Sequence, residues 1–361
     1  MNTNNKIAIV SASLGIGGAE RFASLLSFIL SDLGYEVHNI IITDKVDYQY
    51  KGELINLGEI FRSEKGIFKS LKKGKFINDY LTRNDINTII DNRSRPFFLR
   101  EIFTKIIYSN RKKVFIVHSS NLEMYLSGFI FGAKYLYKNA DKLVCVSRAI
   151  EEKLKKEFGF NNTQTIYNPI SISKKSYDKP VGLPEKYFLF FGRLEENVKN
   201  FSLLLDSYKK SSVSEQNFKL VIIGDGSDKE LINAKIKVLG LSSDVVLLPF
   251  VSDIQPYIQH TFCTLLTSHF EGFPMAIIES LAVGTPVISV DCPTGPSEII
   301  QDRLNGLLVP NYNTEAFSKA MKAMIEEDDL YQSCKMYAQK SVEHLSLDKI
   351  ALQWKKLLIE L

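Results

Sequence analysis

TSHFEGFPMAIIESLAVGTPVIS, Thr267–Ser289, is the stretch that decides the fold of this 361-residue chain. It follows a short apolar run, Cys263–Leu266, and leads into a second, Pro286–Val290. Between the two runs, Gly-Phe-Pro is typical of a helix start and Gly284 of a helix end, because proline is favoured in the first turn and glycine just after the last. Strand, helix and strand in this order predict a βαβ unit with parallel strands.

The same alternation extends along the rest of the chain. It begins with a strand at Lys6–Ser11 and a helix at Ala19–Leu33, and a segment rich in proline, serine and charge, 168–186, interrupts it. We therefore predict an α/β protein with two Rossmann-like, doubly wound domains, 1–180 and 181–346. Further strands are expected at Glu36–Thr43, Asn87–Asp91, Val114–Val117, Leu143–Ser147, Gln164–Tyr167, Tyr187–Phe191, Phe218–Ile223, Val245–Leu248 and Gly306–Val309.

Charge is divided unevenly between the two halves. Residues 1–180 hold 28 Lys and Arg against 18 Asp and Glu, whereas the remainder holds 17 against 23. Within 57–113, 14 cationic residues are mixed with large apolar ones, and Phe98, Ile102 and Ile106 recur every four residues. This pattern fits a helix lying on an anionic membrane, and equally an amphipathic helix packed on the sheet. Recognised nucleic-acid motifs are absent from the sequence, so no nucleic-acid partner is expected.

The cellular compartment follows from what the sequence lacks. Apolar runs are too short to span a bilayer, and the start has no basic segment followed by an apolar core, as a secretory signal would. The four cysteines and five histidines are scattered, which disfavours a structural zinc site. We expect a cytoplasmic protein with buried free thiols.

Small residues follow the first strand in SLGIGGAER, Ser13–Arg21. Gly17 and Gly18 would let backbone amides approach an anion at the start of the next helix. A tight turn without a ligand explains them equally well, because the spacing is not that of a dinucleotide-binding loop. Dinucleotide-binding folds carry an acidic residue near the end of the second strand, and Asp44 lies there. This feature alone therefore does not exclude a nicotinamide enzyme.

Cations follow the first strand of the second half. Arg193 and Lys199 in FFGRLEENVKN, Phe190–Asn200, would lie at the carboxyl edge of the sheet, where doubly wound folds bind ligands. A forked guanidinium and a lysine together suit a diphosphate. Ordinary surface charge is the alternative.

One glutamate of the opening stretch, Glu271, precedes the helix, and another, Glu279, lies inside it. The first amides of that helix, near Met275 and Ala276, are free to hold an anion. Glu271 and Glu279 would repel a diphosphate, so we expect them to accept hydrogen bonds from neutral hydroxyls such as those of ribose and hexose. The apolar neighbours of Glu279 disfavour a solvated helix face.

Taken together, these motifs resemble the retaining glycosyltransferases of family 4, which have the fold called GT-B. The resemblance covers nearly the whole chain and is carried by Gly17-Gly18-Ala-Glu-Arg, Cys145-Val-Ser, Asn168-Pro, Gly192-Arg…Lys199, Gly224-Asp-Gly, Glu271-Gly-Phe-Pro-Met-Ala-Ile-Ile-Glu279, Gly284-Thr-Pro-Val and Asn305-Gly-Leu-Leu-Val-Pro. It implies two domains facing a central cleft, with the last helix, 347–361, packing back on the first domain.

The resemblance also implies a role for each residue. Arg193 and Lys199 would hold the donor diphosphate, Glu279 the ribose and Glu271 the transferred sugar. Backbone around Val251 would meet the base, and Gly17 and Gly18 would close over the phosphates or face the acceptor. His118, which ends the run VFIVH, matches the family's histidine beside the sugar, and this histidine and Glu271 are the expected catalytic pair.

We therefore expect a hexosyltransferase that uses a nucleotide-diphosphate sugar, with UDP the expected nucleotide. The sequence contains no Asp-x-Asp, so neither a metal nor another cofactor is expected. The segment DCPTGPSEI, Asp291–Ile299, resembles family members that build bacterial surface polysaccharides, which implies a lipid-linked saccharide acceptor and a peripheral place at the membrane. A UDP-sugar 2-epimerase of the same fold and a non-catalytic nucleotide-sugar-binding subunit are the alternatives.

Overall fold

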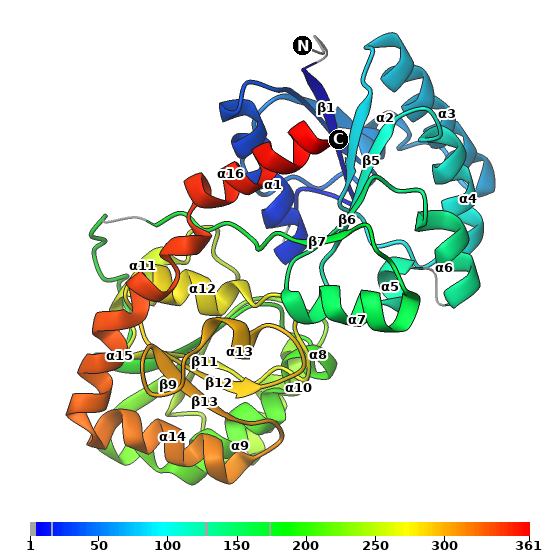
Figure 1. The fold of residues 1–361 in the computed structure, drawn as a ribbon. Coiled ribbons are helices and arrows are strands. Elements are labelled where there is room, and N and C mark those ends of the chain that lie inside the picture. Colours follow the sequence, from blue (N-terminus) through cyan, green and yellow to red (C-terminus); the bar gives the residue numbers. More distant parts are fainter. Residues whose placement is uncertain (1–4, 16, 127–128, 173–174) are drawn as a thin grey trace. The chain divides into compact units, whose positions relative to one another are not determined.

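The computed structural model describes residues 5–15, 17–126, 129–172 and 175–361. The chain divides into two units (Figure 1). Unit 1 comprises the chain up to Pro169 together with Leu347–Leu361, and unit 2 comprises Ile170–Ser346. The division, after Pro169, falls at the start of the segment 168–186, which is rich in proline, serine and charge.

Unit 1 contains a seven-stranded sheet in the order β3-β2-β1-β4-β5-β6-β7, and every neighbouring pair is parallel. The order reverses between β1 and β4, so unit 1 is a doubly wound Rossmann-like domain. Its strands are β1 (Lys6–Ser11), β2 (Glu36–Ile41), β3 (Glu53–Asn56), β4 (Thr88–Asp91), β5 (Lys112–Val117), β6 (Lys142–Cys145) and β7 (Thr163–Thr165).

Side-chain caps start two of the unit 1 helices, α2 with Asn56 and α7 with Ser147. The Ser147 hydroxyl accepts a hydrogen bond from the Ile150 amide at the start of α7, and Gly159 ends that helix in the left-handed conformation. The helices are α1 (Gly18–Asp32), α2 (Leu57–Ile60), α3 (Ile67–Arg83), α4 (Phe98–Ile107), α5 (Glu123–Leu126), α6 (Ile130–Tyr137), α7 (Arg148–Phe158) and α16 (Leu347–Glu360).

Unit 2 repeats the architecture with six parallel strands in the order β10-β9-β8-β11-β12-β13, which reverses between β8 and β11. The strands are β8 (Lys186–Phe191), β9 (Phe218–Ile223), β10 (Val245–Leu248), β11 (Cys263–Leu266), β12 (Val287–Asp291) and β13 (Gly306–Pro310). The helices are α8 (Glu196–Lys199), α9 (Phe201–Ser211), α10 (Lys229–Val238), α11 (Gln255–His260), α12 (Met275–Ala282), α13 (Pro296–Ile299), α14 (Thr314–Glu326) and α15 (Asp328–Ser341).

The last helix of the chain belongs to unit 1. Ile350, Trp354 and Leu357 lie one turn apart on α16 and are fully buried. The Trp354 ring packs 6.3 Å from the ring of Phe22, which lies on α1. These apolar residues attach the C-terminal segment to unit 1, as the family resemblance implies for helix 347–361.

The predicted α/β class with two parallel sheets is confirmed, and most predicted strands agree with the structure to within two residues. Strand β3 was not predicted. Its sequence, ELIN, is short and only Ile55 is buried, so it carries little hydrophobic signal of its own. All four cysteines are buried and free, as expected.

Candidate active site

Arg193 lies at the carboxyl edge of the unit 2 sheet, in the loop that follows β8. Two close backbone contacts hold this loop: the Leu194 amide donates to the Asp225 carbonyl at 2.9 Å, and a Cβ on Gly226 would lie 2.4 Å from the Leu194 carbonyl oxygen. The glycine is therefore required for the approach of the two loops. The Arg193 side chain is 54% exposed, and its Nη1 lies 3.3 Å from Glu195 Oε1.

Lys199 and Glu271 form an ion pair beside this loop. Nζ of Lys199 lies 2.6 Å from Oε1 of Glu271, and the Ser268 hydroxyl donates to the same carboxylate oxygen at 2.6 Å. The two charged side chains are only 17% and 12% exposed. Because an ammonium has three donors, Lys199 can bind Glu271 and still donate to a phosphate.

Helix α12 starts directly after Glu271, Gly272, Phe273 and Pro274. Its first intrahelical bond runs from the Ile277 amide to the Pro274 carbonyl at 3.1 Å, so the amides of Met275 and Ala276 precede the helical ladder. Glu279, one turn further on, is only 5% exposed. A solvated helix face is thereby excluded for Glu279, and a carboxylate buried this far needs hydrogen-bond donors.

Val251 is placed apart from these residues. It follows β10, which lies two strands away from β8, and its half-buried side chain packs against the apolar cluster that includes Leu189 and Ile223. The structure thus brings Arg193, Lys199 and Glu271 to the reversal point of the unit 2 sheet, with α12 next to them, and Val251 to the outer part of the same edge.

The second group of expected residues lies in unit 1, after β1 and β5. Gly17 caps α1 and Gly18 is its first residue, while Ile16 lies outside the described residues. His118 follows β5 and is half-buried, 5.0 Å from the ring of Phe22 and 6.2 Å from that of Tyr125. Burial, with a smaller contribution from the positive charge of Arg95, lowers the pKa of His118 to about 3, so the imidazole is neutral at pH 7.

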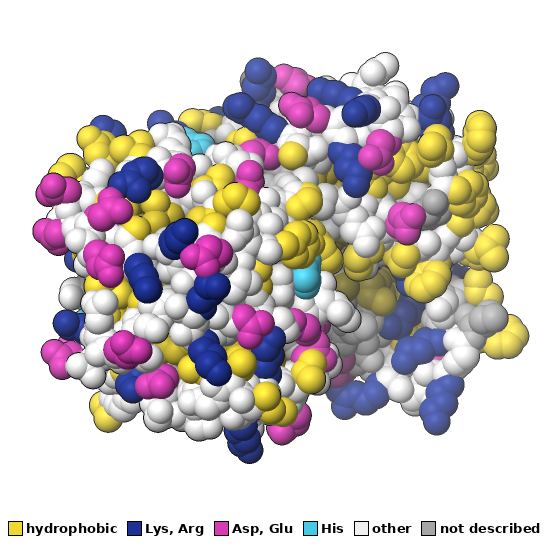
Figure 2. All heavy atoms as spheres, turned by 90° about the horizontal axis from the view of Figure 1, so that it is seen from below, with side chains coloured by type: hydrophobic (Ala, Val, Ile, Leu, Met, Phe, Trp, Pro, Cys, Tyr) yellow, Lys and Arg dark blue, Asp and Glu magenta, His cyan; other side chains and the backbone are white. Residues whose placement is uncertain are grey.

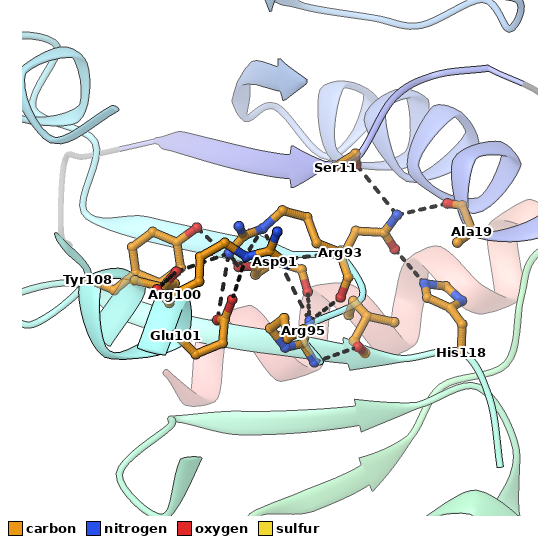
Figure 3. Close-up of polar contacts among 12 residues, drawn as sticks. Ser11, Ala19, Asp91, Arg93, Arg95, Arg100, Glu101, Tyr108 and His118 are labelled. Carbon is orange, nitrogen blue, oxygen red and sulfur yellow. Dashed lines mark hydrogen bonds and ion pairs between the residues drawn. The ribbon is translucent and has the colours of Figure 1, made fainter. Parts of the chain in front are cut away.

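The side-chain amide of Asn92 connects these two parts of unit 1, and Figure 3 draws it without a label between Ser11, Ala19 and His118. Its Nδ2 donates to the carbonyl oxygen of Ala19, in the first turn of α1, at 2.8 Å. Its Oδ1 lies 2.5 Å from Nε2 of His118. Asn92 is 3% exposed and follows β4, the neighbour of β1 in the sheet, so the histidine and the glycine loop share one buried amide.

A buried charge cluster lies beside this amide (Figure 3). Arg93 contacts Asp91 at 2.6 Å and Glu101 at 3.9 Å, and Arg95 is fully buried, donating to the Ile116 carbonyl at 3.0 Å. Although burial acts to raise it, the Arg93 guanidinium holds the pKa of Asp91 below its ordinary value, whereas burial raises that of Glu101. Arg93 and Arg95 therefore belong to the interior rather than to a basic surface.

Helix α4, which follows this cluster, buries polar side chains and exposes several apolar ones. Glu101 and Thr104 are its buried residues, whereas Leu99, Phe103 and Ile106 are 73%, 52% and 63% exposed. Of the stripe expected from the sequence, Phe98 and Ile102 are half-buried and Ile106 is exposed, so α4 packs this stripe on its neighbours only in part. The neighbouring helix α6 adds exposed apolar side chains, and Lys105 of α4 donates to the Tyr135 carbonyl at 2.6 Å.

We call the exposed residues of these two helices the α4–α6 face: Phe97, Leu99, Arg100, Phe103, Ile106, Ile130, Phe131, Lys134 and Tyr135. Figure 2 shows hydrophobic side chains gathered at the right of the view, with lysine and arginine side chains beside them. Helices α4 and α6 contain one acidic residue, the buried Glu101. The face is therefore both apolar and cationic.

Comparison with known proteins identifies the family. The model described as "Glycosyl transferases group 1" matches residues 173–341, and that of "Glycosyltransferase Family 4" matches residues 16–174. An N-acetylgalactosaminyltransferase of Campylobacter jejuni, named for its action on a diacetylbacillosaminyl-diphospho-undecaprenol substrate, is 31% identical over 361 residues, covering 96% of this chain and 97% of the relative. The chain belongs to the family 4 glycosyltransferases.

Further relatives place this glycosyltransferase among enzymes of similar fold. The amylovoran biosynthesis glycosyltransferase of Erwinia amylovora is 25% identical over 346 residues, covering 95% and 96% of the two chains. The crystal structure of HepE of Anabaena in complex with UDP-glucose matches with a TM-score of 0.78 and 19% identity, covering 99% of this chain and all of that one. The predicted GT-B fold is thereby confirmed.

Two residues that contact the candidate site were not predicted from the sequence. Asn92 and Ser268 each contact an expected catalytic residue, His118 and Glu271 respectively. Both follow strands adjacent to the reversal points, β4 and β11, so polar residues just after those strands were the available signal. Among the residues that the structure describes, no group of three or more His, Cys, Asp or Glu side chains could hold a metal ion.

Proposed function

We propose that this glycosyltransferase transfers a hexose or N-acetylhexosamine from a UDP-sugar to a lipid-linked saccharide in the synthesis of a bacterial surface polysaccharide, such as an O-antigen or capsule, with retention of configuration. The observation that carries the proposal is the cluster in unit 2, where Arg193, Lys199 and the start of α12 surround the reversal point of the sheet. Each of these groups stabilises negative charge.

The chemistry follows from where charge develops. As the bond between the sugar and UDP breaks, negative charge accumulates on the diphosphate, and preorganised donors stabilise it more than they stabilise the ground state. Arg193, Lys199 and the amides of Met275 and Ala276 are these donors. Glu279 accepts hydrogen bonds from the ribose and Glu271 from the sugar, while backbone near Val251 contacts the base. These cationic groups take the place of a metal, so no metal or other cofactor is required.

Glu271 has a further role through its ion pair with Lys199. The carboxylate fixes the ammonium in a half-buried position, so little side-chain entropy is lost when the donor binds. In unit 1, Gly17 and Gly18 would approach the phosphates or the acceptor through their backbone, and His118 would contact the sugar.

Relatives support the choice of donor and acceptor. HepE of Anabaena was crystallised with UDP-glucose, and the Campylobacter relative is named for an undecaprenol-linked substrate. A lipid-linked acceptor requires access to a membrane surface, and within the described parts of the chain no helix is long and apolar enough to cross one. We propose that the α4–α6 face binds the anionic inner leaflet of the cytoplasmic membrane, so that the enzyme acts peripherally.

The decisive experiment offers the purified protein a panel of nucleotide sugars with polyprenyl-diphosphate-linked saccharides, and identifies the products by mass and their anomeric configuration by NMR. We expect transfer from one or a few UDP-sugars with retention. Conversion of the UDP-sugar to its 2-epimer without acceptor would establish the epimerase, and tight nucleotide-sugar binding without any product would establish the non-catalytic subunit.

A further inference from the structure

The hydrogen bonds of Asn92 leave only one arrangement for its side-chain amide. A carbonyl oxygen accepts but cannot donate, so the atom 2.8 Å from the Ala19 carbonyl must be the NH₂ group of Asn92. The same group lies 3.5 Å from the Ser11 hydroxyl. The oxygen Oδ1 therefore faces His118.

This orientation determines the protonation of the imidazole ring. Oδ1 of Asn92 accepts only, and Nε2 of His118 lies 2.5 Å from it, so Nε2 must carry the proton. His118 is neutral at pH 7, which leaves the lone pair on Nδ1. The rings of Phe22 and Tyr125 pack against the imidazole and limit its rotation.

We propose that Asn92 is a positioning residue for the transfer reaction, holding His118 as the Nε2–H tautomer so that Nδ1 accepts a hydrogen bond from a hydroxyl of the transferred sugar. The inference rests on the proposed role of His118 beside the sugar. The same amide links His118 to the glycine loop, because it donates a hydrogen bond to the carbonyl of Ala19, one residue after Gly18.

The backbone of Asn92 explains why this position is rigid. Its amide donates to the Val10 carbonyl at 2.8 Å, which continues the pairing of β4 with β1 by one residue. A side chain fixed on a sheet strand positions a reactive group more accurately than one on a free loop.

Nitrogen-15 NMR of the histidine rings tests the tautomer directly and needs no activity. In the full-length protein at pH 7, we expect a single Nε2–H tautomer for His118, with its ring proton shifted downfield and slow to exchange with water. Asn92→Ala should abolish that shifted signal, while Asn92→Asp, which retains an acceptor oxygen, should keep it. An Nδ1–H tautomer in the wild-type protein would overturn the proposal.

Kinetics test the catalytic consequence. Asn92→Ala should lower kcat by on the order of 10-fold to 100-fold, as when the partner that orients a functional histidine is removed, with little change in KM for the nucleotide sugar. Asn39→Ala, which removes another buried amide of unit 1 that donates to a main-chain carbonyl, is the matched control and should retain kcat. In a His118→Ala background, the Asn92 substitution should have almost no further effect.

An equal loss from Asn92→Ala with and without His118 would show that Asn92 acts independently of the histidine and would overturn the inference. Failure of the proposed function would look different: the protein would transfer no sugar with any donor, while the NMR tautomer stayed as expected.

Discussion

Nζ of Lys199 and Oε1 of Glu271 lie 2.6 Å apart at the carboxyl edge of the unit 2 sheet, in a pair that is largely shielded from water. The family resemblance implies that these residues bind different parts of the donor, Lys199 the diphosphate and Glu271 the sugar. Their pairing means that the cation is already oriented before a ligand arrives, and that removing either partner leaves the other charge half-buried.

We expect Arg193→Ala and Lys199→Ala each to cost on the order of 2–4 kcal/mol of transition-state stabilisation, with Lys199 the more costly. Lys199→Ala leaves the Glu271 carboxylate next to the diphosphate without its cation, whereas Arg193 is half exposed. Steady-state kcat/KM measures both. Lys219→Ala, which breaks a similar 2.6 Å pair with Asp244, is the control and should retain activity. Near-normal turnover of both site variants would refute the donor site.

Activity should survive removal of metal ions. The proposed site neutralises the diphosphate with side-chain cations and helix amides, so excess EDTA should change the initial rate by less than about twofold, compared with the hundredfold scale expected for loss of one charge-stabilising group. Loss of activity on chelation, restored by Mn²⁺ or Mg²⁺, would contradict this mechanism.

His118 should make stability depend on pH. Its pKa is about 3 in the folded protein against an ordinary value of 6.5, so below pH 6.5 the unfolded chain binds a proton that the folded chain does not. Stability is therefore fully present above pH 6.5 and is lost as pH falls, by about 1.4 kcal/mol at pH 5.5. Urea unfolding at pH 7.5 and 5.5 measures how far the free energy of unfolding falls between the two pH values. This fall should be smaller for His118→Gln than for the wild type by roughly this amount. His269→Gln, in unit 2, controls for the removal of a histidine, and an unchanged loss in His118→Gln would contradict the burial argument.

Attachment of the last helix should depend on Trp354. The indole is fully buried against Phe22, so Trp354→Ala should destabilise unit 1 by about 3–5 kcal/mol. Trp354→Phe should cost much less, because it keeps most of the apolar contact and removes an indole N–H that has no hydrogen-bond partner among the residues the structure describes. Denaturant unfolding measures both. Leu352→Ala, exposed on the same helix, should stay within about 0.5 kcal/mol of wild type. A truncation at Ser346 that folds and works normally would contradict the role of α16.

Membrane binding should require apolar and cationic side chains of the α4–α6 face. Each large apolar side chain that leaves water contributes about 1.5–3 kcal/mol, and each nearby cation about 1 kcal/mol on an anionic surface. Replacing Phe103, Ile106 and Phe131 by serine should nearly abolish binding to anionic liposomes in a flotation assay. Salt should weaken the binding of the wild-type protein, which should bind neutral liposomes poorly.

The control for this experiment lies in unit 2, where serine at Leu231 and Val238 replaces equally exposed apolar residues and should leave liposome binding unchanged. The serine variant of the α4–α6 face should also lose more activity on a lipid-linked acceptor than on a short soluble analogue. If the wild-type protein does not bind anionic liposomes, the proposal that the α4–α6 face binds the membrane is wrong.

The sequence by itself determined the alternation of strands and helices, and with it the two parallel sheets and the sheet edge at which a ligand site is predicted. Strands of a parallel sheet are buried on both faces, so each can be recognised in the sequence as an apolar run whatever its position in the sheet. The residues that follow these strands all lie at the same edge of the sheet. That reasoning predicts Arg193 and Lys199 at this edge, where the structure places them beside Glu271 and helix α12, and the role of each of these residues in binding stays a prediction.

Only the tertiary structure decided which faces are buried and which groups are paired. The repeat in α4 predicts a helix with an apolar side, but whether that side packs on the sheet depends on its neighbours, and here Glu101 faces inward to meet Arg93. Arg95 lies in a segment rich in cations, yet it is fully buried, and its guanidinium donates to the carbonyls of Asp91 on β4 and Ile116 on β5. Asn92 and His118 are 26 residues apart, and only the order of the strands brings them into contact. Local periodicity records the chain's own preferences, whereas burial and pairing are set by segments that folding brings from elsewhere.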